Sequence, residues 1–213
     1  MHKKILLICF VFLLVGCKKI ESNENYIGFV NNCLNDDYVT NEVSLGYQYY
    51  IPKGVKKVQD YDYNQVFLVD DSKMYLYVDI ISYFYQEQKS DNLTGNGDYY
   101  YQPINYQKKN GYLSIVLKDE QYFVTIMYHY SKIEVYTTKE NLSKVITLAS
   151  IILNSIDYND TVIEKVLQGD LGQFSEFTYE VDKPDDASSN FSQLLEEYVQ
   201  KEEEEENEQL PGE

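Results

Sequence analysis

The residues with the greatest catalytic potential lie near the middle of the chain. His129 precedes Ser131 by two residues and Glu134 by five. An imidazole, a hydroxyl and a carboxylate are the groups that a serine hydrolase combines. The sequence lacks the G-x-S-x-G turn that exposes such a serine, and strand alternation places Glu134 on a different strand from His129. We therefore predict no catalytic residue and interpret His129 as a partly buried, hydrogen-bonded imidazole.

Metal ligands and phosphate-binding loops are the next chemistry to consider. No H-E-x-x-H, C-x-x-C or EF-hand spacing occurs in the chain. The acid pairs Asp36-Asp37 and Asp70-Asp71 fall in predicted turns, where carboxylates are usually solvated. The Gly/Asn-rich segment 91–98 has no phosphate-binding pattern. The sequence therefore predicts neither a metal site nor a cofactor.

A cysteine ends the first apolar run of the chain. Residues 5–15 are uninterruptedly apolar and follow the cations Lys3 and Lys4. A run of this length spans about 16 Å as a helix, whereas a membrane span needs roughly 20 residues. The pattern is typical of a secretory signal peptide.

The end of this run, Leu14-Val15-Gly16-Cys17, resembles the lipobox of bacterial lipoproteins, [LVI]-x-[GA]-C. The resemblance implies that residues 1–16 are removed as a lipoprotein signal peptide and that the thiol of Cys17 carries a thioether-linked diacylglycerol. Two acyl chains hold a protein firmly on a bilayer. We therefore expect an anchor through Cys17 on the extracytoplasmic face of the cell membrane. The alternatives are an ordinary signal peptide that contains a cysteine, or a buried apolar helix.

Residues 17–43 are predicted to form the lipidated N-terminus, a polar tether and one short helix. The helix is indicated by the spacing of Tyr26, Ile27, Val30 and Leu34. With Cys9 in the signal peptide and Cys17 acylated, Cys33 has no partner for a disulfide within the chain. Its neighbours include no activating cation, so we interpret it as a packed thiol.

An α+β domain is predicted over residues 44–168. Alternation of apolar and polar residues, with turn residues between the runs, indicates strands at 47–51, 66–69, 74–84, 99–106, 111–118, 122–128 and 132–136. The short connections imply antiparallel neighbours. In the run 74–84, we expect Met74, Leu76, Val78, Ile80 and Phe84 on one face and Tyr75, Tyr77, Asp79 and Tyr83 on the other.

Two helices are predicted after these strands. Apolar residues at three-to-four spacing between Leu142 and Ile156 indicate the first, with Thr137 as N-cap and Glu140 completing a capping box. The second follows Asn159-Asp160 as its cap and ends at Gly169.

The start and the end of this domain resemble a known fold. Residues 46–54, G-Y-Q-Y-Y-I-P-K-G, are similar to the strand that opens PsbP-like domains, and the helix that ends I-L-N-S-I-D-Y at Tyr158 is similar to the helix that closes them. The resemblance covers residues 44–158 and implies an α/β/α sandwich around an antiparallel sheet, in a family of mostly binding and assembly proteins. The wider pattern, with every basic residue a lysine and 23 tyrosines, also resembles uncharacterised lipoproteins of low-GC Gram-positive bacteria.

Tyrosines gather in the middle of the chain. Tyrosine favours strands and combines an apolar ring with a polar tip. Such a row either forms a sheet face that helices cover, which we favour, or is exposed and binds a glycan or a peptide. The candidate binding residues are Tyr75, Tyr77, Tyr83, Tyr99, Tyr100 and Tyr101.

The acidic charge of the chain is concentrated in its tail, residues 169–213. The formal net charge is −17, and residues 170–213 contain 15 acids and two lysines. Nucleic-acid binding is not expected, because phosphate contacts need clustered cations. Within this tail, an amphipathic helix is predicted near residues 190–201, followed by the acidic run 202–206. Its apolar stripe, a candidate for docking to a partner, consists of Phe191, Leu194, Leu195, Tyr198 and Val199.

Two classes of function remain. The first is a non-enzymatic, membrane-tethered module that binds an envelope protein or wall component, or assists the assembly of a membrane complex. The second is an envelope hydrolase or small-molecule-binding enzyme whose site has no recognisable motif. The absence of catalytic motifs and the single histidine after Cys17 favour the first.

Overall fold

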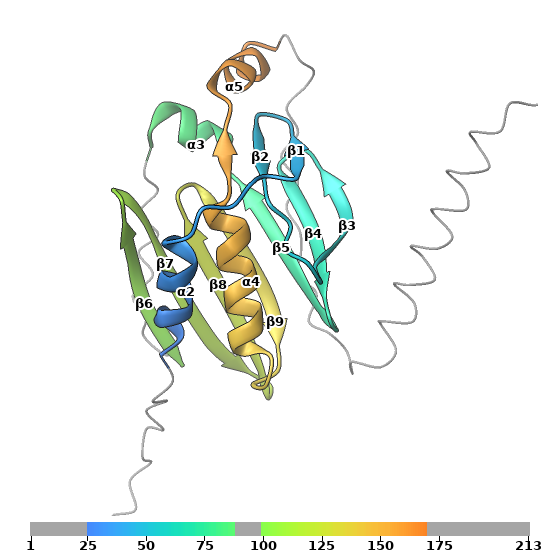
Figure 1. Cartoon of the computed structure of the whole chain (residues 1–213), viewed down its shortest axis with the longest axis vertical. Helices are drawn as coiled ribbons and strands as arrows, with labels where there is room; N and C mark the ends of the chain where they lie inside the picture. The colour runs from blue at the N-terminus through green and yellow to red at the C-terminus, as the bar shows by residue number, and fades with distance from the viewer. Residues whose placement is uncertain (1–24, 88–98, 170–213) are drawn as a thin grey trace, which may run out of the picture.

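A computed structural model describes residues 25–87 and 99–169 and has an α+β architecture, as predicted (Figure 1). The helices are α2 (Tyr26–Leu34), α3 (Ile80–Tyr85), α4 (Leu142–Asn154) and α5 (Asp160–Leu167). The strands are β1 (Glu42–Ser44), β2 (Tyr47–Tyr49), β3 (Lys56–Tyr61), β4 (Asn64–Val69), β5 (Ser72–Val78), β6 (Tyr100–Tyr106), β7 (Lys109–Lys118), β8 (Gln121–Tyr128), β9 (Ser131–Thr137) and β10 (Asp157–Tyr158).

The strands form two antiparallel sheets. The larger has the order β3-β4-β5-β9-β8-β7-β6, and the smaller has the order β1-β2-β10. In the larger sheet, β3 to β5 and β6 to β9 are two runs of hairpins, which join where β5 pairs with β9. The chain therefore leaves the sheet after β5 and returns at the opposite edge with β6.

Helices α2 and α4 pack against each other and cover one face of the larger sheet (Figure 1). On α4, the stripe that includes Val145, Ile146 and Leu153 is buried, as its spacing predicts. On α2, Tyr26 and Val30 are also buried. Because these side chains belong to one hydrophobic core with the sheet, the core includes the short helix predicted within 17–43, outside the predicted domain 44–168.

The helices α3 and α5 lie at one end of the molecule, and they contact each other there (Figure 1). The turn between β8 and β9 is at the same end, whereas α2 begins at the opposite end (Figure 1). The ring that Tyr26 contacts, Tyr100, lies in the strand row of Val124, five residues before His129 along β8.

The predicted strand at 74–84 is wrong after Val78, because residues 80–85 form α3. The Asp79 carboxylate caps this helix by accepting hydrogen bonds from the Ser82 backbone N–H and hydroxyl, both at 2.8 Å. A cap of this kind satisfies backbone donors that a strand would pair with its neighbour. The chain therefore turns away from the sheet, and Tyr83 leaves the face that carries Tyr75 and Tyr77.

The predicted capping box is also wrong. Thr137 is the last residue of β9, where its buried side chain accepts a hydrogen bond from the Ser72 hydroxyl at 3.2 Å. Helix α4 instead begins after Asn141, whose side chain makes no capping hydrogen bond. The prediction for α5 is confirmed, since the Asn159 side chain accepts from the Val162 N–H at 3.1 Å and Gly169 follows the helix with φ of 82°.

Several sequence predictions fall outside the described residues. They are the signal peptide 1–16, the acylated Cys17, and the tail helix 190–201 with its stripe Phe191, Leu194, Leu195, Tyr198 and Val199. Within 25–87 and 99–169, no helix combines the length and the apolar character that crossing a membrane requires. Cys33, which does lie in the described part, is buried on α2 as expected for a packed thiol.

Candidate binding site at the aromatic end

The six tyrosines singled out from the sequence do not form one surface. By register, Tyr75 and Tyr101 lie in one row across the sheet, β5-β9-β8-β7-β6. Four strand spacings separate them, which is about 19 Å. Tyr75 is only 4% exposed, and Tyr77 has the Lys132 ammonium 4.8 Å from its ring centroid.

The tyrosines at the start of β6 pack within the domain. Tyr100 points to the helix-covered face, where its ring meets Tyr26 edge-on at 5.3 Å and its hydroxyl accepts from the Ile27 N–H at 3.1 Å. Tyr99 meets Tyr122 edge-on at 5.1 Å, and Tyr101 stacks on Tyr112 at 5.9 Å. Tyr100 therefore lies on a sheet face that helices cover, which is the alternative favoured from the sequence.

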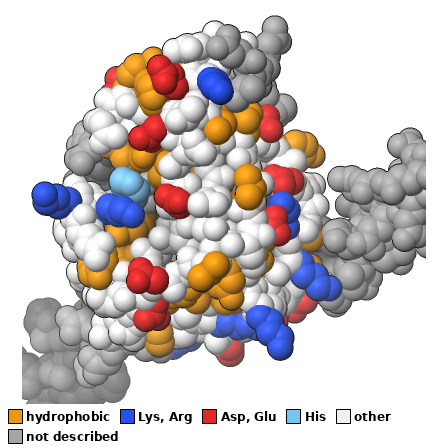
Figure 2. Space-filling model, turned by 45° about the horizontal axis from the view of Figure 1, so that its top comes forward, with side chains coloured by type: hydrophobic (Ala, Val, Ile, Leu, Met, Phe, Trp, Pro, Cys, Tyr) orange, Lys and Arg blue, Asp and Glu red, His pale blue; other side chains and the backbone are white. Residues whose placement is uncertain are grey.

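A different cluster of rings forms at the α3–α5 end of the molecule. Tyr83 of α3 stacks on Tyr158 of β10, with ring centroids 3.8 Å apart and planes inclined by 13°. His129 and Tyr130, in the turn between β8 and β9, meet Tyr83 edge-on at 5.9 Å and 5.8 Å. We call these four residues the aromatic end. Figure 2 shows the only described histidine at the surface there, among hydrophobic side chains and beside a lysine.

Local structure brings these four side chains together. The Asp79 cap starts α3 and so directs Tyr83 toward the end of the sheet. Tyr158 is held by the pairing of β10 with β2, opposite Tyr47. Its hydroxyl donates to the carbonyl of His129 at 3.0 Å, which ties β10 to the β8–β9 turn.

The β8–β9 turn has an unusual sequence for its backbone. His129 and Tyr130 both have left-handed conformations, with φ of 47° and 65°. Two-residue hairpin turns of this type favour Asn-Gly, because a side chain at positive φ is strained. The turns at 107–108 and 119–120 have the same left-handed pairs, so this backbone alone does not distinguish the β8–β9 turn. Here the two bulky residues extend two rings past the end of the sheet.

His129, Tyr83 and Tyr158 are uncharged near neutral pH. Burial, with a smaller effect from Lys109, lowers the pKa of His129 to about 4. Burial and the hydrogen bond from the Tyr83 hydroxyl to Asp160, 2.9 Å long, raise the pKa of Tyr83 to about 12. Burial raises the pKa of Tyr158 well above its usual range. The site therefore offers neutral rings, while the hydroxyls of Tyr83 and Tyr158 are paired with Asp160 and with the His129 carbonyl.

The hydrolase-like group considered from the sequence is not brought together. The Ser131 hydroxyl is buried and donates to the Tyr128 carbonyl at 2.7 Å, and Glu134 pairs with Lys132 at 2.8 Å. Neither contact involves His129. The imidazole of His129 is partly buried, as predicted. Among residues 25–87 and 99–169 it has ring contacts but no hydrogen bond, so the predicted hydrogen bond is wrong. No group of side chains in these ranges is arranged to hold a metal ion.

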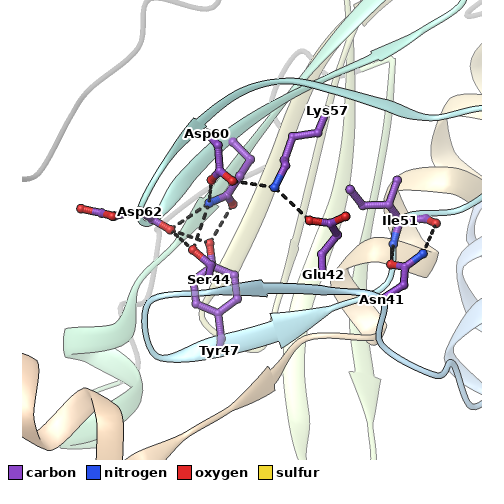
Figure 3. Close-up of polar contacts among 9 residues, drawn as sticks. Asn41, Glu42, Ser44, Tyr47, Ile51, Lys57, Asp60 and Asp62 are labelled. Carbon is purple, nitrogen blue, oxygen red and sulfur yellow. Dashed lines mark hydrogen bonds and ion pairs between the residues drawn. The ribbon is translucent and has the colours of Figure 1, made fainter. Parts of the chain in front are cut away.

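Apart from the aromatic end, a cluster of polar side chains joins the two sheets (Figure 3). The buried Gln65 side chain accepts from the Tyr47 hydroxyl at 2.7 Å and donates to the Asp62 carbonyl at 2.8 Å and to the Asp60 carboxylate at 3.1 Å. Lys57 pairs with Asp60 at 2.6 Å and with Glu42 of β1 at 2.9 Å. Since each of these groups is paired within the cluster, its role is to hold the small sheet on the β3–β4 hairpin.

Sequence reasoning included Tyr83 among the candidates but missed Tyr130 and Tyr158. A usable signal was present, because the predicted strands 122–128 and 132–136 leave only a tight connection that contains His129 and Tyr130. The stacking of Tyr158 on Tyr83 had no such signal, since it depends on α3 and β10 meeting in three dimensions.

No family model, curated protein or solved structure matches the chain.

Proposed function

We propose that the protein is a lipid-anchored module on the extracytoplasmic face of the cell membrane, which binds an envelope protein or wall component without catalysing a reaction. The lipobox at Leu14–Cys17 supports the anchor. The rings of the aromatic end support binding, because partly exposed aromatic faces can stack on sugar and peptide groups.

The observation that carries this proposal is the position of the aromatic end relative to Tyr26. They lie at opposite ends of the domain (Figure 1). The chain from Cys17 to Asn25 covers eight residues, at most about 28 Å when extended. The tether enters the domain at α2, so the aromatic end is the part of the domain that can extend furthest from the membrane.

We also propose that the domain has the PsbP-like fold. Two features support this: residues 46–54 contain the short strand β2 followed by Pro52, and the closing helix is α4. The similarity suggests binding or assembly, in agreement with the absence of a catalytic motif from the sequence.

Substitution in the β8–β9 turn tests the binding proposal. Tyr130→Asn removes one ring, and asparagine tolerates the left-handed backbone. Glu120→Asn is the matched control, because Glu120 has φ of 69° in the turn at the other end of β8. Both variants are incubated with isolated wall glycan, and the bound fraction is measured. We expect Tyr130→Asn to weaken binding by about two- to tenfold, the effect of one lost aromatic contact.

If the two variants bind alike, the aromatic end is not the binding surface. If the unaltered protein does not bind the glycan, the same pair of variants is compared by crosslinking to neighbouring proteins in intact cells. Equal crosslinking patterns in that assay would contradict the proposal as a whole.

A further inference from the structure

A shallow groove runs over the outer side of α4, away from the aromatic end. Its volume is about 370 Å³, and it is open to solvent. The floor is formed by Ser143, Lys144, Thr147 and Leu148 of α4. Phe29 of α2 forms one wall, and the Lys53-Gly54 turn before β3 forms the other.

The groove has two properties of a helix-binding surface. Most of its lining is apolar, and the Phe29 side chain of α2 remains 38% exposed. Lys53 and Lys144 are the two cations among the residues that line it. Lys144 also pairs with Asp70 at 2.5 Å. Because both side chains of this pair are about half exposed, the pair is weak, and another carboxylate can replace Asp70.

The sequence contains one segment with the complementary pattern. In Phe191–Val199, the apolar residues recur at i, i+3, i+4, i+7 and i+8, and Glu196 and Glu197 fall outside that stripe. As a helix this segment is about 14 Å long, comparable to two or three turns of α4. A helix this short is only marginally stable in water unless its stripe is buried against a partner.

The chain length allows the segment to reach the groove of its own domain. Twenty-one residues separate Gly169, the last described residue, from Phe191. They span up to about 70 Å when extended, while a domain of this size is roughly 40 Å across. Tethering at this length gives millimolar effective concentration, which favours the same chain over a separate partner.

We propose that Phe191–Val199 binds in the groove over α4 of the same chain as an amphipathic helix. The stripe packs against Phe29 and Leu148, and the neighbouring glutamates face Lys53 and Lys144. The acidic run 202–206 adds attraction that weakens with salt. This inference does not depend on the lipid anchor or on the aromatic end.

Disulfide trapping tests the inference in the chain 18–213. Cys33→Ala removes the native thiol, and Ser192→Cys, at the edge of the stripe, is paired with Ser143→Cys in the groove. The control pairs Ser192→Cys with Glu164→Cys, an exposed position on α5 beside the point where the tail leaves the domain. Circular dichroism verifies that both proteins fold, and the rate of disulfide formation is followed under mild oxidation.

We expect the groove pair to close at least about tenfold faster than the α5 pair, at a rate independent of protein concentration. Adding Lys53→Glu and Lys144→Glu should remove that advantage, whereas Lys139→Glu and Lys165→Glu, which reverse two exposed lysines outside the groove, should not. Faster closure of the α5 pair would mean that the tail is not docked. Disulfide-linked dimers that form in proportion to concentration would mean that the groove binds a second copy. Either result overturns the inference.

Discussion

Replacing His129 with asparagine separates the titration of the imidazole from that of every other acid-sensitive group. His129 is the only histidine in residues 18–213, and burial lowers its pKa from 6.5 to about 4 in the folded protein. Between these values the unfolded chain binds a proton that the folded chain does not. Stability from this group is therefore complete above pH 6.5 and is lost as the pH falls toward 4.

The size of the effect follows from the two pKa values. One pKa unit corresponds to about 1.4 kcal/mol. The His129 contribution is then about 1.4 kcal/mol lower at pH 5.5 than at pH 7, and about 3 kcal/mol lower at pH 4. Because the imidazole is only partly buried, solvent screening reduces these values, and we expect a total loss of about 1 to 3 kcal/mol.

The assay is urea denaturation of the original protein and His129→Asn at several pH values. Carboxylates affect both proteins alike, so the difference between their free energies of unfolding isolates the imidazole. The changed ring contacts and the relief of backbone strain by asparagine add an offset that does not depend on pH. An NMR titration of the single imidazole measures the folded-state pKa directly. A pKa of 6.5 or higher, or a stability difference that stays constant from pH 7 to 4, would refute the burial of His129.

Two further substitutions test how the domain is held together. Tyr26→Ala should lower the free energy of unfolding by about 3–5 kcal/mol, because Tyr26 is fully buried against the sheet. Asn32→Ala, on the exposed side of the same helix, should change it by less than about 0.5 kcal/mol. Equal melting temperatures for the two variants would show that α2 is not part of the core. Tyr47→Phe should cost about 1–3 kcal/mol, because it leaves the buried Gln65 oxygen without its donor; a variant as stable as the original in urea denaturation would mean that this cluster does not hold the small sheet.

The spacing of apolar residues predicted those elements in which it matches the side that is buried. The stripe from Leu142 to Ile156 and the strict alternation of burial in β9 are examples, whereas burial in β7 and β8 does not alternate in this way. The edge strand β3 was missed because its side chains are mostly exposed and polar, so one face differs little from the other. The strand at 74–84 was overextended because the pattern of apolar and aromatic residues continues past Val78, while a single carboxylate, Asp79, starts the helix.

The candidate site was predicted less completely than the fold. The prediction grouped Tyr100 with Tyr101 in one surface, and residue spacing could not show that Tyr100 is used to pack α2. The aromatic end combines residues from α3, the β8–β9 turn and β10, which are far apart in the sequence. Its formation depends on tertiary contacts such as the hydrogen bond from Tyr158 to the His129 carbonyl. Residue spacing carries no information about such contacts.

The proposed anchor on Cys17 is tested most directly by the mass of the mature protein extracted from membranes. We expect a chain that starts at Cys17 and carries two acyl chains in a thioether-linked diacylglycerol, with radiolabelled fatty acid incorporated. Cys17→Ala should give an uncleaved precursor without label, because the acylated thiol is what the resemblance to lipoproteins requires. An unmodified Cys17 in the mature protein, or equal labelling of Cys17→Ala, would contradict the account of a lipid-tethered module.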